Sequence, residues 1–143
     1  MIEISLPWPP SINHYWRTAV IKGHAQTYIS AEGKHYRSLV WHAVKRHKLP
    51  TLLGRLNVHI VARPPDKRIR DLDNVLKSLL DALARADVYV DDGQIDVLYI
   101  RRSVPSSGGM VEVCITEIQD LVAMGQRNAD IVPRSILYIE GSP

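Results

Sequence analysis

Acidic side chains are concentrated in the segment RDLDNVLKSLLDALARADVYVDDGQI, which runs from residue 70 to residue 95. Asp71 and Asp73 are two residues apart where the chain enters an apparent helix, and Asp91 and Asp92 follow that helix. Residues i and i+2 of an extended chain point the same way, so the first two carboxylates can converge. Oxygen ligands without His or Cys are those that hard cations such as Mg²⁺ or Mn²⁺ prefer. If the helix folds back on the later turn, these aspartates predict a metal site.

Cationic side chains accompany the aspartates. The run RPPDKRIRD places Lys67, Arg68 and Arg70 directly before the first aspartate, and Lys77 lies one helical turn after Asp73. Arginine and lysine bind phosphate oxygens, and a bound metal can activate water and stabilise charge on a phosphate under in-line attack. The combination predicts hydrolysis of a phosphate ester. The spacing alone does not select which ester is cut.

Each of these residues also has a structural explanation. Asp73 or Asn74 could cap the helix, and the sequence Asp-Asp-Gly is common in turns. Lys77 could be a solvated surface residue or could pair with Asp81, four residues later. These explanations suit single residues, and they account less well for the whole combination.

The pattern of elements predicts an α+β single domain with two helices packed on a mixed β-sheet. Alternating apolar residues predict strands at 2–6, 55–63, 88–90, 95–102 and 110–118. Helical spacing predicts helices from the N-cap Ser30 to about Lys48 and from 73 to 86. The second helix has one apolar face for the core: Val75, Leu76, Leu79, Leu80 and Leu83. Residues 8–28 indicate an irregular loop or a short hairpin.

Composition places the chain among ordinary globular proteins. It has 143 residues, a net charge of +3 and one cysteine, Cys114, whose alternating apolar neighbours predict a buried strand position. A single thiol builds no disulfide framework, no apolar stretch is long enough to cross a bilayer, and no signal peptide is visible. We therefore expect a cytoplasmic location and no membrane partner. The domain should span 1–119, and 120–143 form a tail of unknown role.

Four motifs in order carry a resemblance to a known family: LPWPPSIN, YISAEGKHYR, RDLDNVLKSLLDAL and VYVDDGQI. Together they resemble the RusA family of Holliday-junction resolvases, over residues 2–118. The resemblance implies a RusA-like fold that forms a two-fold homodimer. It also implies an Mg²⁺-dependent endonuclease, a crossover junction endodeoxyribonuclease of DNA recombination and repair. Such an enzyme places paired nicks across a four-way DNA junction.

The resemblance also implies roles for individual residues. The metal-binding catalytic carboxylates would be Asp71, Asp73 and Asp92, with Asp91 at the same metal site and Lys77 as the essential cation. The DNA-binding residues would be Lys67, Arg68, Arg70, Asn13 and Arg17. Two positions depart from the family pattern: Ile69 interrupts the basic run, and Asp87 stands where glycine is common.

Three functions compete at this point. A junction-resolving nuclease suits a homodimer, because two symmetric cuts on a two-fold substrate need two sites related by a two-fold axis. A protein that binds branched DNA without cutting gains nothing from carboxylates beside phosphates. A small-molecule phosphohydrolase could use the same metal site. Junction binding without Mg²⁺ separates the first two from the third, and cleavage on adding Mg²⁺ separates the first from the second.

Overall fold

The computed structural model describes residues 1–118, so the predicted tail at 120–143 lies outside the described residues. The elements in chain order are β1 (Ile2–Pro7), α1 (Ile12–Tyr15), β2 (Trp16–Ile21), β3 (His24–Ile29), α2 (Ala31–Arg46), β4 (Leu56–Arg63), α3 (Asp73–Arg85), the 3₁₀ turn η1 (Asp92–Gln94), β5 (Ile95–Arg102) and β6 (Met110–Glu117).

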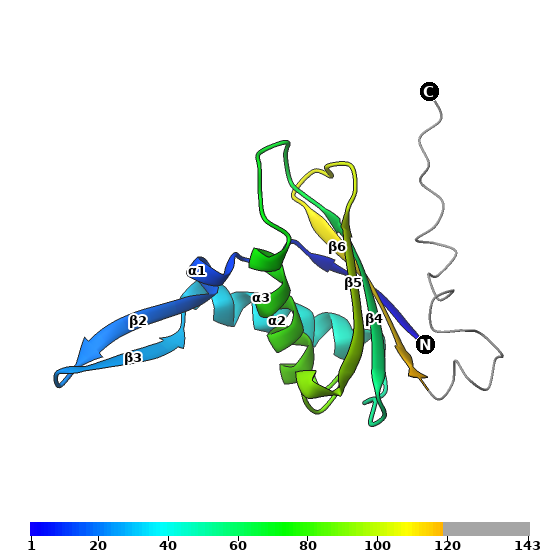
Figure 1. Cartoon of the computed structure of the whole chain (residues 1–143), viewed down its shortest axis with the longest axis horizontal. Helices are drawn as coiled ribbons and strands as arrows, with labels where there is room; N and C mark the ends of the chain where they lie inside the picture. The colour runs from blue at the N-terminus through cyan, green and yellow to red at the C-terminus, as the bar shows by residue number, and fades with distance from the viewer. Residues whose placement is uncertain (119–143) are drawn as a thin grey trace.

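A four-stranded sheet in the order β1-β6-β4-β5 forms the centre of the fold. Strand β4 pairs parallel with β5 and antiparallel with β6, and β6 pairs antiparallel with β1, which confirms the predicted mixed sheet. Helices α2 and α3 cover one face of it (Figure 1). The buried apolar side chains of β4 on this face are Leu56, Val58, Ile60 and Ala62. They share one core with both helices, so the α+β prediction is confirmed.

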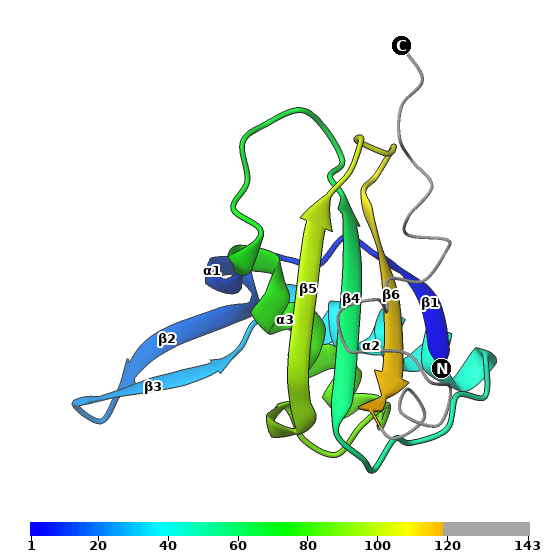
Figure 2. The same cartoon turned by 45° about the vertical axis from the view of Figure 1, so that its right-hand side comes forward.

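The prediction of two helices is wrong by one, because residues 8–28 contain the short helix α1 followed by a hairpin. Strands β2 and β3 form a sheet of their own, which extends away from the main sheet (Figure 2). Lys22 and Gly23 turn the chain with φ angles of 50° and 77°, as the tight turns of hairpins require. The hairpin was one of the two alternatives that the sequence left open.

The strand predicted at 88–90 is also wrong. Its pairing is an isolated bridge between Leu52 and Tyr89. Asp87 adopts a φ of 63°, the left-handed conformation that usually calls for glycine, and the amide of Val88 donates to the carbonyl of Leu83 at 3.1 Å. Val88 and Tyr89 are then buried in the core. Their β-forming side chains therefore serve a packed connection after α3 rather than a strand.

The start of α2 agrees with the sequence. The Ser30 hydroxyl accepts a hydrogen bond from the Gly33 amide at 2.9 Å, which confirms Ser30 as the N-cap. A Cβ at Gly33 would lie 2.7 Å from the Tyr15 carbonyl oxygen and from the Ile29 side chain, so only glycine fits there. This close contact fixes α2 against α1 and the end of the hairpin.

Two polar side chains of β4 face the side of the sheet opposite the helices. Asn57 Oδ1 and both ring nitrogens of His59 are buried and have no hydrogen-bond partner among residues 1–118. The His59 ring lies 5.4 Å from the ring of Tyr99, centroid to centroid. Burial lowers the pKa of His59, so the folded protein favours the neutral imidazole.

We expect His59→Phe to raise the free energy of unfolding and to reduce its loss in mild acid. As pH falls below about 6.5, the unfolded chain binds a proton that the folded imidazole resists, so the free energy of unfolding falls. Phenylalanine removes this proton and two unsatisfied nitrogens. Urea unfolding at about pH 7 and about pH 5 measures the effect. His35→Phe, at an exposed position, is the control. If the free energy of unfolding falls between these two pH values as much in His59→Phe as in wild type, the expectation is contradicted.

Candidate active site

Helix α3 presents two of the predicted site residues, Asp73 and Lys77, on its solvent side. It begins at Asp73, and its N-cap, Leu72, makes no side-chain capping bond. Capping by Asp73 or Asn74 is therefore not what the structure shows, although a carboxylate in the first turn suits the helix dipole. Val75 and Leu79 are buried on the opposite side. Leu83 is buried with them, while Leu76 and Leu80 are partly buried, which confirms the apolar face.

Lys77 makes contact with the second aspartate motif. Its Nζ lies 3.5 Å from Oδ2 of Asp92, and both side chains are about half exposed, at 55% and 50%. The pair of Lys77 with Asp81, which the sequence left open as a possibility, does not form, because Asp81 binds Arg37 and Tyr15 instead. An exposed ion pair adds little stability. The contact matters because it joins two sequence motifs in one place.

Asp91 has a clear structural role beside Asp92. Its carboxylate accepts a hydrogen bond from the Gly93 amide at 2.7 Å, and its own amide donates to the Gln94 side chain at 3.0 Å. The bond to the Gln94 side chain is one half of a capping box around η1, in which the Asp91 carboxylate also accepts from the Gln94 backbone amide. Gln94 also donates to the carbonyl of Gly54 at 2.9 Å. The turn explanation therefore holds for Asp91, which fixes the backbone that carries Asp92.

An acidic residue organises the basic loop between β4 and α3. Asp66 Oδ2 accepts from Nη2 of Arg70 at 3.0 Å and lies 3.4 Å from Nε of Arg68. The hydrogen bonds from Arg70 hold the pKa of Asp66 well below its usual range. Arg102 donates to the carbonyl of Arg70. Sequence reasoning passed over Asp66, although its spacing of four from Arg70 was a visible signal. Lys67 and Arg68 remain exposed on this loop.

The N-terminal motif lies next to the first aspartate. Trp8, His14, Asp71 and Asn74 line one pocket, and the Ser78 hydroxyl donates to the carbonyl of Pro10, the last proline in PWPP, at 2.6 Å. Helix α1 packs against both α2 and α3. This arrangement leaves Asn13 on α1 and Arg17 on β2 exposed.

The four predicted carboxylates do not form one closed ligand set. Asp71 lines the pocket beside the N-terminal motif, whereas Asp91 and Asp92 line another pocket with Lys77. Within residues 1–118 no three His, Cys, Asp or Glu side chains are grouped so that they could hold a metal ion. Carboxylate oxygens suit Mg²⁺ chemically, but their placement here does not fit a preformed site in one chain. Metal binding stays a prediction.

A further group of linked polar side chains at this site was not identified from the sequence. Tyr15, Arg37 and Asp81 are linked by hydrogen bonds, and Asp81 lines the same pocket as Lys77 and Asp92. The three residues come from α1, α2 and α3. No local pattern in the sequence connects them, because their contact depends on how the three helices pack.

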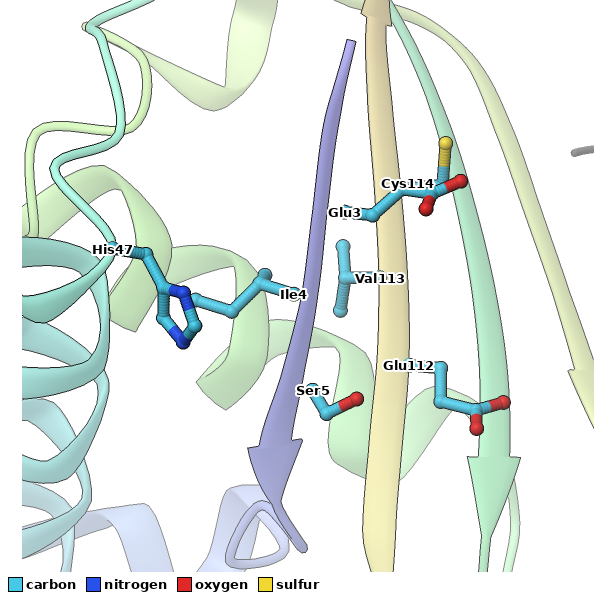
Figure 3. Close-up of a pocket in the computed structure, with 7 residues that line it drawn as sticks. All are labelled: Glu3, Ile4, Ser5, His47, Glu112, Val113 and Cys114. Atoms are coloured by element: carbon cyan, nitrogen blue, oxygen red, sulfur yellow. The ribbon is translucent and has the colours of Figure 1, made fainter. Parts of the chain in front are cut away.

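Another pocket lies at the edge of the sheet, away from these residues. Glu3, Glu112, Cys114 and His47 line it, and Figure 3 shows the first three on strands β1 and β6, with His47 at the end of α2. Cys114 is a buried strand residue, as predicted. Burial raises the pKa of its thiol to about 11. A thiol this hard to ionise is a poor nucleophile.

Comparisons with known proteins place the chain beside a group of nucleases. A family described as "Endodeoxyribonuclease RusA" matches residues 7–116. The crossover junction endodeoxyribonuclease rusA of Enterobacteria phage HK97 is 41% identical over 120 residues, which cover 83% of this chain and 97% of that protein. The RusA proteins of Shigella sonnei and Escherichia coli K12 are 39% and 38% identical over 117 residues, with 81% of this chain and 94% of each relative covered. No helix within residues 1–118 is long and apolar enough to cross a membrane.

Proposed function

The chain belongs to the RusA family of endodeoxyribonucleases, and from this premise we propose that it resolves Holliday junctions by paired, symmetric nicks. The relatives named crossover junction endodeoxyribonucleases match more than four fifths of the chain. The matched range, residues 7–116, also spans the four aspartates and the lysine that the sequence singled out.

The contact between Lys77 and Asp92 is the observation that supports this proposal best. The two residues are 15 positions apart, yet their side chains lie 3.5 Å apart on one exposed surface. A cation beside a carboxylate can bind an oxygen of the scissile phosphate, while the carboxylate faces the side from which water attacks the phosphorus. In this proposal Lys77 Nζ contacts the scissile phosphate. The catalytic carboxylates are Asp71, Asp73 and Asp92.

The proposed DNA contacts lie on two segments next to α3. Lys67, Arg68 and Arg70 belong to the loop that precedes it, and Asn13 and Arg17 belong to α1 and β2. Cationic side chains that neutralise phosphates make binding strongly dependent on salt. Arg70 is already bound to Asp66, so we expect it to orient the loop as well as to contact DNA.

We also propose that cleavage requires Mg²⁺, with Mn²⁺ as a possible substitute. The predicted ligands are Asp71, Asp73, Asp91 and Asp92, whose oxygens suit a hard cation. When bound, the ion would activate the attacking water and stabilise charge on the phosphate. Because Asp71 lines a different pocket from Asp91 and Asp92, the proposal requires the carboxylates to come closer when DNA and metal bind.

The proposed assembly is a two-fold homodimer, because paired nicks across a two-fold junction need two equivalent sites. Sedimentation equilibrium of the full chain tests the assembly, and a monomer at all concentrations would contradict it.

The cytoplasmic location also stays a prediction.

The function is tested on a synthetic four-way junction, with a linear duplex of the same sequence as control. We expect symmetric nicks on the junction alone, with Mg²⁺ and not with EDTA, and a large loss of rate in Lys77→Met. Junction binding in EDTA should persist. Binding without cleavage in Mg²⁺ would favour a non-cutting DNA-binding protein. Hydrolysis of small phosphodiesters without junction binding would favour a small-molecule phosphohydrolase.

A further inference from the structure

Asp81 is placed where it could compete for the lysine of the site. It follows Lys77 by one helical turn on α3 and lines the same pocket as Lys77 and Asp92. Residues four apart on a helix are neighbours whose opposite charges attract. Yet Lys77 Nζ lies 3.5 Å from the carboxylate of Asp92. The Asp81 carboxylate therefore has other partners that balance its charge.

These partners of the Asp81 carboxylate are Arg37 and Tyr15. Arg37 on α2 approaches Oδ2 of Asp81 with Nε at 2.9 Å and Nη2 at 2.7 Å. The Tyr15 hydroxyl donates to the same oxygen and accepts from Arg37 Nε at 2.7 Å. The side chains of Arg37 and Asp81 are only 23% and 18% exposed. Asp81 is thus a largely buried carboxylate whose charge is balanced by one guanidinium.

The guanidinium itself is held by aromatic rings. Arg37 Cζ lies 5.5 Å from the centroid of the Tyr15 ring and 5.8 Å from that of Trp16, where cation–π attraction operates. Burial, and then the hydrogen bond to Asp81, raise the pKa of Tyr15, so its hydroxyl stays a donor. Tyr15 is also held by the close approach of Gly33. The guanidinium is therefore fixed before any substrate binds.

We propose that Arg37 is a positioning residue for cleavage: it neutralises Asp81 and so leaves Lys77 free to face Asp92 and the phosphate. The proposal rests on the proposed function, in which Lys77 acts on the scissile phosphate. Without Arg37, Asp81 would be a carboxylate with little solvent and no cation, which is strongly unfavourable. The flexible stem of Lys77 allows its ammonium to move one helical turn toward the C-terminal end of α3, to Asp81, and replace the missing charge.

The test compares Arg37→Met, Asp81→Asn and the double variant in the full chain. We expect Arg37→Met to lower the single-turnover rate of junction cleavage about tenfold, with the junction Kd in EDTA within about twofold of wild type. The double variant should recover the rate of Asp81→Asn, because no competing charge remains. Its unfolding temperature should stay below that of wild type, because the bond between α2 and α3 is still absent.

A purely structural role for Arg37 gives a different pattern. Activity would then follow the unfolding temperature, and the double variant would remain slow, which would overturn the proposal. If Arg37→Met does not fold, Tyr15→Phe replaces it: removing one donor to Asp81 should give a smaller loss of rate, again reversed by Asp81→Asn. No reversal in that pair would overturn the proposal equally.

Two controls separate this inference from the proposed function. Arg37→Lys keeps a cation beside Asp81 and should retain most of the cleavage rate. Lys77→Met should lose cleavage in every background. If wild type does not cut junctions, or Lys77→Met cuts them normally, the proposed function fails. If both behave as expected and only the recovery by Asp81→Asn is missing, the role of Arg37 fails alone.

Discussion

Asp73→Asn should abolish junction cleavage and leave junction binding intact. Asp73 opens α3 with an exposed side chain and makes no capping bond, so its carboxylate is available for chemistry rather than for folding. Asparagine keeps the shape and removes the charge. We expect the single-turnover cleavage rate to fall on the order of 10³-fold, as when a group that stabilises a transition state is removed. The junction Kd in EDTA should stay within about threefold, since loss of an anion does not weaken phosphate binding.

Asp87→Asn is the matched control for this substitution. Asp87 follows the same helix and is exposed, and its carboxylate pairs only with Lys45 among the described residues, at 3.6 Å. Its φ of 63° is a conformation that asparagine tolerates well. The control should therefore fold and cut junctions at the wild-type rate. Normal cleavage by Asp73→Asn, or an equal loss in both variants, would mean that the first carboxylate of α3 is not part of the reaction.

Leu79→Ala should cost the fold about 2–5 kcal/mol of unfolding free energy, the range for large-to-small changes in a packed core. Leu79 is fully buried on the inner face of α3, in one core with Val58 and Ile60 of β4 and Val40 of α2. Few neighbouring groups can move into the space that the Leu79 side chain leaves, because the sheet and α2 enclose it. Urea unfolding followed by circular dichroism measures the change.

The same helix carries Lys77, so the loss of packing should also reach the site. We expect Leu79→Ala to lose cleavage activity at a lower temperature than wild type, in step with its unfolding transition. Leu53→Ala is the control, because Leu53 is 75% exposed and surface changes usually stay within about 0.5 kcal/mol. Equal stability of the two variants would show that α3 is not anchored through Leu79.

Features that depend on neighbours along the chain were predictable from the sequence. The Ser30 cap, the apolar face of α3 and the strands β1, β4, β5 and β6 follow from capping chemistry and from periods of 3.6 and 2 residues. The strand predicted at 88–90 failed for a local reason as well. Val88 and Tyr89 favour strands, but Asp87 takes a left-handed turn that sends them into the core.

The sequence by itself determined which residues are candidates for the site, because their types, spacing and motifs are properties of the chain. Only the tertiary structure decided their partners. It pairs Lys77 with Asp92 rather than with Asp81, four residues away, because α2 brings the cation of Arg37 to that carboxylate. Such choices depend on the packing of elements far apart in the sequence. Local spacing shows which pairs are possible, and the competition between distant charges determines which of them form.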